Sequence, residues 1–228
     1  MSTYTRILMD GDWKHPLSKA VKTALESAVK TPRLPFHINL IDGMSGISYR
    51  EFINYLVSLV DNPRYLEIGS WAGSTACSAM YNNKLTINCI DNWSEFGGPK
   101  EQFFNNIKST TTESTAFNFY ESDFRQLDYK TIGKHNIYLF DGPHEYEDQK
   151  DGVCIPVEAL DDTYILIVDD YNWPKVRNGT LDGLSNLKYT ILSSIEVRTT
   201  EDDSHPEISG RHSKWHNGYF IAVVSKSN

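Results

Sequence analysis

Acidic residues and glycines follow the apolar runs of this sequence at positions where they could bind a ligand. Glu67 and Gly69 come at the end of one run, Asp91 follows the next, and Asp141 follows a later one. A carboxylate at such a position can accept hydrogen bonds from ribose hydroxyls or bind a metal ion. Ligands of α/β folds bind at the carboxyl ends of the strands, so we expect these side chains to lie near one another.

The segment 67–75 reads Glu-Ile-Gly-Ser-Trp-Ala-Gly-Ser-Thr. Gly69 allows a sharp turn out of a strand, and Gly73 allows the next helix to pack closely while backbone N–H groups face a ligand. The spacing is G-x-x-x-G and not the G-x-G-x-x-G that binds a pyrophosphate, which argues against a dinucleotide and a nicotinamide oxidoreductase. A plain strand-to-helix turn is the alternative interpretation.

The pattern E-x-G-x-x-x-G resembles the first motif of class I S-adenosylmethionine-dependent methyltransferases. The resemblance implies that this loop contacts the methionine and ribose parts of the cofactor. It also implies that Asp91 binds the ribose hydroxyls and that Asp123 and Phe124 lie at the adenine. Helix capping is the alternative role for Asp91. The loop residues that we assign to the cofactor are Glu67, Gly69, Ser70, Trp71, Gly73 and Ser74.

Two more acids, Asp169 and Asp170, follow the apolar run after the one that Asp141 ends. If the corresponding strands are neighbours, about 5 Å apart, these carboxylates converge beside the cofactor loop, where Asp141 also borders the cofactor. Their repulsion can be relieved by a shared proton, a basic partner or a divalent cation, and hard oxygen ligands suit Mg²⁺. Capping or solvation of the strand ends is the alternative.

This pattern resembles the metal-dependent O-methyltransferases of the catechol type and of the sugar-modifying group that includes macrocin O-methyltransferase. The resemblance implies that Asp141, Asp169 and Asp170 hold Mg²⁺, with Asp170 in place of the amide of the catechol type. His144 takes the place of that family's basic general base, and histidine titrates near neutral pH. A solvent-facing position in the first turn of a helix is its alternative role. The expected reaction is methyl transfer to a hydroxyl of a small molecule, with His144 and Asp141 catalytic.

Other polar segments could surround the acceptor, which would be a sugar, a polyketide-like molecule or a phenol. Asn172 and Trp173 are predicted to line its pocket, and the alternative is that Trp173 and Pro174 shape the entry to the next helix. The segment 43–46 and the polar loop 199–216 are candidate lids, although a turn and a solvated loop are the alternatives. The histidines of the second loop match no compact zinc motif. They are His205, His212 and His216.

Two further functions would use the same residues. One is a metal-independent methyltransferase in which Asp141 and His144 act alone, and the other is a non-catalytic cofactor-binding protein. Methylation of nucleic-acid amino groups is disfavoured, because the segment 141–144, Asp-Gly-Pro-His, does not resemble the Asp/Asn-Pro-Pro-Tyr/Phe motif. The net charge of −8, with scattered Lys and Arg, also argues against a nucleic-acid partner.

Short apolar runs rich in β-forming residues alternate with helical segments from residue 64 onward, which indicates βαβ units on a parallel sheet. The last two runs, joined by a polar loop, predict an antiparallel pair at one edge. The fold class is therefore α/β, a doubly wound, mostly parallel Rossmann-like sheet of about seven strands with an antiparallel C-terminal hairpin. The predicted strands are 65–68, 86–90, 117–120, 137–140, 164–168, 189–197 and 218–224.

Residues 1–63 predict an N-terminal helical extension before a methyltransferase domain of residues 64–228. Apolar residues at helical spacing predict a helix over 16–30, and Ser48 and Glu51 have the spacing of a capping box that opens a second helix. These helices could supply the face of a homodimer.

The composition is that of a globular chain, with 228 residues of which 39% are hydrophobic, enough for one well-buried domain. Residues 1–14 contain no signal-peptide run, and no stretch approaches the length of a membrane span. Cys77, Cys89 and Cys154 lie far apart and indicate reduced thiols. We therefore expect a cytoplasmic protein with no membrane partner.

Overall fold

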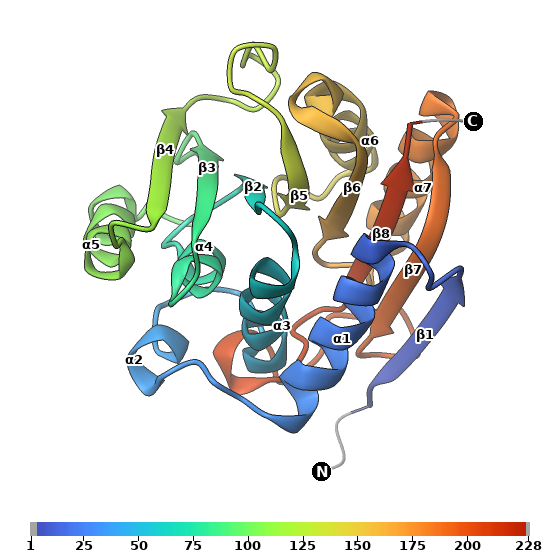
Figure 1. The fold of residues 1–228 in the computed structure, drawn as a ribbon. Coiled ribbons are helices and arrows are strands. Elements are labelled where there is room, and N and C mark those ends of the chain that lie inside the picture. The colour runs from blue at the N-terminus through green and yellow to red at the C-terminus, as the bar shows by residue number, and fades with distance from the viewer. Residues whose placement is uncertain (1–3, 227–228) are drawn as a thin grey trace.

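The computed structural model describes residues 4–226, and one eight-stranded sheet runs through it (Figure 1). The strand order is β1-β7-β8-β6-β5-β2-β3-β4. Strands β4, β3, β2, β5 and β6 pair in parallel, whereas β8 pairs antiparallel with β6 and β7, and β1 antiparallel with β7. The strands are β1 (Arg6–Gly11), β2 (Arg64–Ile68), β3 (Leu85–Asp91), β4 (Thr115–Glu121), β5 (His135–Phe140), β6 (Leu160–Val168), β7 (Thr190–Arg198) and β8 (Tyr219–Ser225).

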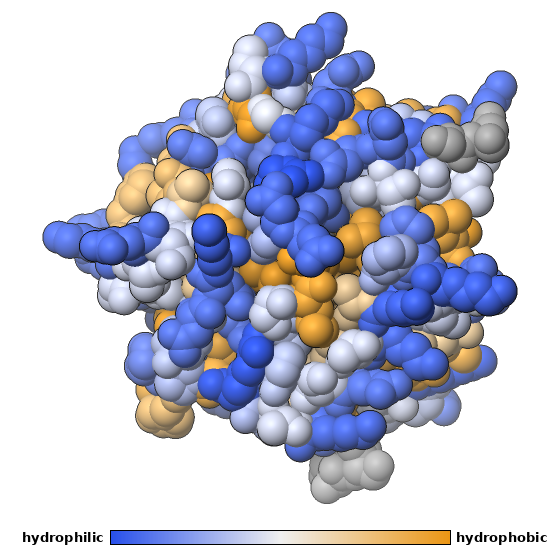
Figure 2. All heavy atoms as spheres, in the orientation of Figure 1, coloured by the Kyte–Doolittle hydropathy of each residue, from blue (hydrophilic) through white to orange (hydrophobic). Residues whose placement is uncertain are grey.

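Helices cover both faces of this sheet. One buried cluster joins α1, α3, α4 and α5 to one face, and a second joins α6 and α7 to the other. The view of Figure 2 shows a mostly hydrophilic surface with apolar atoms near its centre. The helices are α1 (Pro16–Lys30), α2 (Phe36–Asn39), α3 (Ile47–Leu59), α4 (Ser74–Met80), α5 (Lys100–Thr110), α6 (Tyr146–Cys154) and α7 (Pro174–Leu187), with short 3₁₀ turns η1 (Ile155–Ala159) and η2 (Gly210–His212).

The sequence patterns of the strands match their positions in the sheet. Every residue of β5 is buried, as in a strand covered on both faces, whereas β4 at one edge alternates between exposed and half-buried residues over most of its length. The order of the strands reverses between β2 and β5, and both neighbours of β2 run parallel to it. The predicted doubly wound α/β sheet with an antiparallel C-terminal pair is confirmed, and its ligand site is expected at this reversal.

Two details of the predicted sheet are wrong. The sheet has eight strands because β1, in the part predicted to be helical, pairs with β7 along its whole length. The C-terminal pair is therefore not at the edge, and β8 lies between β6 and β7. The pattern did not reveal β1 because all six of its residues are exposed, so no buried and exposed positions alternate.

The start of α3 also differs from the prediction. Its N-cap is Gly46, so Ser48 lies inside the helix, where it is buried, and caps nothing. The fully buried Glu51 instead accepts hydrogen bonds from the backbone N–H groups of Arg33 and Leu34, at 2.9 and 3.0 Å. A carboxylate satisfies one partly buried and one buried donor in this way, and it fixes the segment between α1 and α2 against α3.

The helix predicted over 16–30 is confirmed as α1. Pro16 occupies its first turn, His15 Nδ1 accepts a hydrogen bond from the N–H of Leu17, and its predicted inner face is largely buried. In the part of the chain that the structure describes, no helix has the length and apolar character of a membrane span.

We expect Glu51→Ala to lower the free energy of unfolding by about 2 to 3 kcal/mol, because it leaves the buried N–H of Leu34 and the partly buried N–H of Arg33 without an acceptor. Chemical denaturation followed by circular dichroism measures this. The matched control is Glu26→Ala on α1, whose side chain is 52% exposed and should change stability by less than about 0.5 kcal/mol. Equal effects of the two substitutions would contradict the anchoring role of Glu51.

Candidate active site

The loop after β2 has the backbone that its glycines predict. Gly69 has φ +86°, and a Cβ there would lie 1.9 Å from the carbonyl oxygen of Asp141. Gly73, the N-cap of α4, has φ +85°, and its Cβ would lie 3.0 Å from the ring of Phe103. Only glycine tolerates the conformation and the close approach at Gly69, so β2 and β5 end in contact.

Glu67 lies fully buried in β2, beneath this loop. The hydroxyl of Tyr65 donates a hydrogen bond to Oε2 at 2.8 Å, and Oε1 is buried without a hydrogen-bond partner. Burial raises the pKa of Glu67 to about 7, against the opposing effect of nearby hydroxyls. The carboxyl therefore supports the loop from within the core.

Asp91, at the end of β3, ties two loops together. Its Oδ2 accepts a hydrogen bond from the N–H of Trp71 at 2.8 Å, and its Oδ1 accepts one from the N–H of Trp93 at 2.7 Å. It is not a helix cap, because α5 begins only at Lys100. Each oxygen keeps a lone pair for a further donor.

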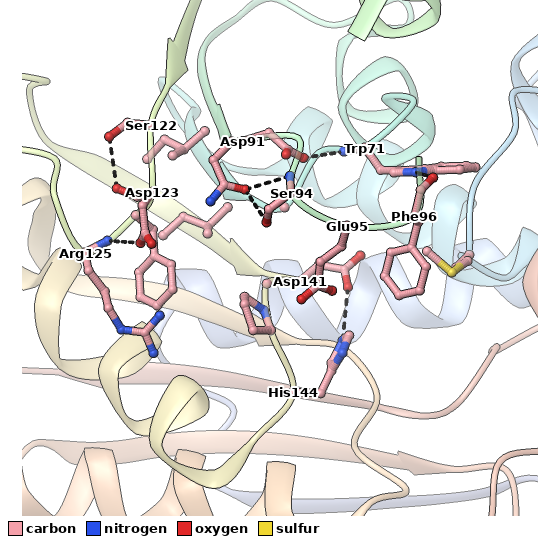
Figure 3. A pocket seen from close by; sticks show the side chains of 18 residues that line it. Trp71, Asp91, Ser94, Glu95, Phe96, Ser122, Asp123, Arg125, Asp141 and His144 are labelled. Atoms are coloured by element: carbon pink, nitrogen blue, oxygen red, sulfur yellow. Dashed lines mark hydrogen bonds and ion pairs between the residues drawn. The ribbon is translucent and has the colours of Figure 1, made fainter. Parts of the chain in front are cut away.

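A pocket of about 830 Å³, including its open mouth, lies at the carboxyl ends of β2, β3, β4 and β5 (Figure 3). The predicted site residues that line it are Gly69, Trp71, Asp91, Asp123, Phe124, Asp141 and His144. The other predicted residues, Glu67, Ser70, Gly73, Ser74, Asp169, Asp170, Asn172 and Trp173, are not part of its lining.

The loop between β3 and α5 supplies wall residues that the sequence did not indicate. Ser94, Glu95 and Phe96 line the pocket, and the indole N–H of Trp71 donates to the carbonyl of Phe96 at 3.1 Å. Phe96 remains 60% exposed. The glycine pair at 97–98, before Pro99, was the available signal of a shaped loop at this strand end.

The segment 43–46, a candidate lid, is held from below by a buried arginine. Arg50 Nε donates to Ser45 Oγ at 2.8 Å, and Arg50 Nη1 donates to the carbonyl of Ile41 at 2.8 Å. Ser45 Oγ lies 3.0 Å from Ser74 Oγ at the start of α4. Met44 of this segment therefore reaches the pocket from a fixed loop and not from a plain solvated turn.

The acids after β5 and β6 converge as their strand positions predict. His144 Nε2 lies 2.8 Å from Asp170 Oδ2 and 3.9 Å from Asp141 Oδ1, and Figure 3 shows His144 and Asp141 pointing toward each other. Asp169 Oδ1 accepts a hydrogen bond from the N–H of Asp170 at 2.6 Å. Asp169 and Asp170 are only 2% and 6% exposed, so these charges are largely removed from water.

Burial and the neighbouring His144 shift the pKa values of this group of acids. Burial raises the pKa of Asp141 to about 6, and burial together with the charges of Asp141 and Asp170 raises that of Asp169 well above its usual value. Burial alone would lower the pKa of His144, but the carboxylates of Asp141 and Asp170 outweigh it and raise the pKa to about 10. In this arrangement His144 is a cation at neutral pH and not a free base.

The predicted magnesium ligands have the donor chemistry that Mg²⁺ requires, but they do not have the required arrangement. Carboxylates are the hard donors that Mg²⁺ prefers, and Asp170 Oδ1 is buried without a hydrogen bond, 3.5 Å from His216 Nε2. However, within residues 4–226 no three His, Cys, Asp or Glu side chains are arranged to hold a metal ion. The predicted metal site at Asp141, Asp169 and Asp170 is therefore not formed in this arrangement, in which His144 pairs with Asp170.

Of the residues expected around the acceptor, Asn172 is buried in the protein, whereas Trp173 lies close to His144. Asn172 is fully buried, and its Nδ2 donates to Thr199 Oγ1 at 2.7 Å and to Asn217 Oδ1 at 3.0 Å, so it anchors the loop 199–216 instead of facing a cavity. The ring of Trp173 lies 5.5 Å from that of His144. His216 Nδ1 accepts a hydrogen bond from the N–H of Gly210 at 2.8 Å, which aims Nε2 at Asp170.

No protein-family model and no curated protein sequence matches this chain. Solved methyltransferase structures share its fold. TrmN from Thermus thermophilus has a TM-score of 0.55 and 12% identity over 83% of this chain and 52% of its own, so the chain spans about half of TrmN. The candidate RNA methyltransferase PH1948 from Pyrococcus horikoshii has a TM-score of 0.56 and 11% identity, covering 90% of this chain and 95% of its own.

The O-methyltransferase TomG from Streptomyces achromogenes, solved with S-adenosylmethionine, has the same fold. Its TM-score is 0.51 at 13% identity, covering 94% of this chain and 92% of TomG. At this level of identity the likeness establishes the Rossmann-like methyltransferase fold. The activity has to be argued from the residues of the pocket.

We expect Glu67→Gln to stabilise the protein at high pH. The folded-state pKa of Glu67 is raised from 4.5 to about 7, so its effect on stability becomes unfavourable as the pH rises through that interval. A neutral amide avoids this effect, and the gain over the parent should be larger at about pH 8 than at about pH 5, by at most on the order of 3 kcal/mol. Denaturation at the two pH values measures it.

The matched control is Glu121→Gln at the end of β4, where the side chain is 50% exposed. It should show no comparable pH dependence. A gain from Glu67→Gln that is the same at both pH values would contradict the raised pKa.

Proposed function

We propose that this chain transfers the methyl group of S-adenosylmethionine to a hydroxyl group of a small molecule. The observation that carries the proposal is the convergence on one pocket of Asp91 from the end of β3, Asp123 after β4, and Asp141 and His144 after β5. A pocket at the reversal of strand order is where this fold binds nucleoside-containing ligands.

The cofactor half of the proposal rests on one wall of the pocket. Asp91 keeps lone pairs for the ribose hydroxyls, beside the loop that Gly69 turns toward the pocket. Phe124 offers an apolar ring beside Asp123, whose carboxylate also lines the pocket and could accept from the adenine amino group. The negative charge of Asp141 then lies where the positively charged sulfonium would be.

The acceptor half rests on the opposite wall. Asp141 and His144 line the pocket, and His144 Nε2 lies 2.8 Å from Asp170 Oδ2, so a hydroxyl placed there meets proton-binding groups beside the methyl donor. The buried carboxylates and the net charge of −8 disfavour a phosphate-rich acceptor. We therefore propose a neutral sugar, polyketide-like or phenolic acceptor.

The proposal includes Mg²⁺ held by Asp141, Asp169 and Asp170. What supports it is the donor chemistry and the unsatisfied Asp170 Oδ1. When bound, the ion would lower the pKa of the acceptor hydroxyl. The negative charges that raise the pKa of His144 would be offset by a cation on these carboxylates. His144 is the residue that would accept the proton of the hydroxyl, at Nε2, once this atom no longer pairs with Asp170 Oδ2.

We expect isothermal calorimetry to detect S-adenosylmethionine binding to the parent chain, and Asp91→Ala to weaken it by about 10- to 100-fold through loss of charge-assisted hydrogen bonds. Glu121→Ala, at the neighbouring strand end but outside the pocket, is the control that should leave the affinity unchanged. The parent should bind a cofactor analogue that lacks the ribose hydroxyls more weakly than it binds S-adenosylmethionine. The Asp91→Ala variant should bind the analogue and S-adenosylmethionine with equal affinity.

Absence of binding to the parent would contradict the proposed function. Equal discrimination against the analogue by both proteins would contradict the ribose role of Asp91, which also ties two backbone N–H groups.

We expect Mg²⁺ alone to bind the parent in a calorimetric titration and Asp169→Asn to abolish this binding. Asp162→Asn, an exposed position of the same strand β6, is the control and should bind the ion like the parent. Failure of the parent to bind Mg²⁺ while it binds S-adenosylmethionine would contradict the metal part alone and favour metal-independent transfer through Asp141 and His144.

A further inference from the structure

The edge strand β1 exposes a row of apolar side chains. Ile7, Leu8 and Met9 are 38%, 41% and 42% exposed, between the charged Arg6 and Asp10. On its inner side β1 pairs with β7 without a register shift. In the described part of the chain no strand pairs with its outer side, so its outward N–H and C=O groups form an open edge. An open, apolar edge is a template for another strand.

The pairing with β7 defines which face each side chain of β1 occupies. Ile7 is opposite Val197 and Met9 is opposite Ile195, and these two β7 residues belong to the buried cluster under α1. Residues directly opposite each other share a face of the sheet, so Ile7 and Met9 extend the face that α1 covers. Arg6, Leu8 and Asp10 lie on the other face.

We propose that a second copy of this chain binds this edge, with the two β1 strands antiparallel about a twofold axis at Leu8. In this register Arg6 is opposite Asp10 of the second copy, and Asp10 is opposite its Arg6. Ile7 is opposite Met9 of the second copy on one face, and the two Leu8 side chains meet on the other. The strand is self-complementary in charge and in apolar surface.

This symmetry selects a second copy over an unrelated partner. A twofold interface requires the same patch to complement itself, and in β1 the positive and negative ends lie equally far from the central leucine. The two sheets become one continuous sheet, and both copies of α1 lie on the same face of it. Six residues form a short interface, so the dimer is weak and concentration-dependent.

Sedimentation equilibrium of the full chain over a wide concentration range tests this dimer. The parent should show a monomer–dimer equilibrium. Leu8→Lys brings two like charges together at the axis and should raise the dissociation constant about tenfold or more. The matched control is Val29→Lys on α1, which is 54% exposed and outside β1, and should leave the equilibrium unchanged. A parent that stays monomeric at every concentration overturns the proposal.

A charge exchange separates pairing from a general loss of stability. Arg6→Asp alone places acids opposite each other twice per dimer and should weaken it, whereas Arg6→Asp combined with Asp10→Arg restores opposite charges and should return the parent equilibrium. Circular dichroism confirms that each variant is folded. The proposal is overturned if Leu8→Lys leaves the dissociation constant of the dimer unchanged. It is also overturned if the double variant dimerises as weakly as Arg6→Asp.

Discussion

The close approach of the ends of β2 and β5 at Gly69 determines where the whole site lies. The N–H of Gly69 donates to the carbonyl of Ile90, that of Asp141 donates to Ile68, and that of Asp169 donates to Phe140. These hydrogen bonds continue the pairing one residue beyond the ends of β2, β5 and β6. Asp91, Asp141 and Asp169 therefore lie at the same edge of the sheet. A side chain at Gly69 would collide with the backbone of Asp141, and the pocket depends on that contact.

The second feature of the site is buried negative charge with little compensation. Asp141, Asp169 and Asp170 lie beside one histidine cation. Burial raises the pKa of Asp141 to about 6 and that of Asp169 well above its usual value, whereas His144 outweighs burial and lowers the pKa of Asp170. Such a site favours positively charged ligands because they compensate buried carboxylates. A sulfonium cofactor and a divalent cation are both of this kind, so the same electrostatics support the two halves of the proposed chemistry.

Much of the fold could be predicted from the sequence, because buried strands and an amphipathic helix leave clear periodicities. The strand β1 could not, since an exposed edge strand leaves no alternation, and the role of Glu51 depends on backbone donors distant in sequence. The convergence of Asp91, Asp141 and His144 followed from strand ends. The buried anchoring role of Asn172 and the ion pair that makes His144 a cation did not, because they depend on three-dimensional contacts with other segments.

We propose that the pocket between Gly69, Asp91 and Asp141 holds S-adenosylmethionine. A crystal structure of the chain grown with S-adenosylhomocysteine would show whether it does. We expect electron density in this pocket, with the ribose hydroxyls within hydrogen-bonding distance of Asp91, the adenine beside Phe124 and the sulfur toward Asp141. Density for the ligand at another place, or an ordered ribose out of reach of Asp91, would contradict it.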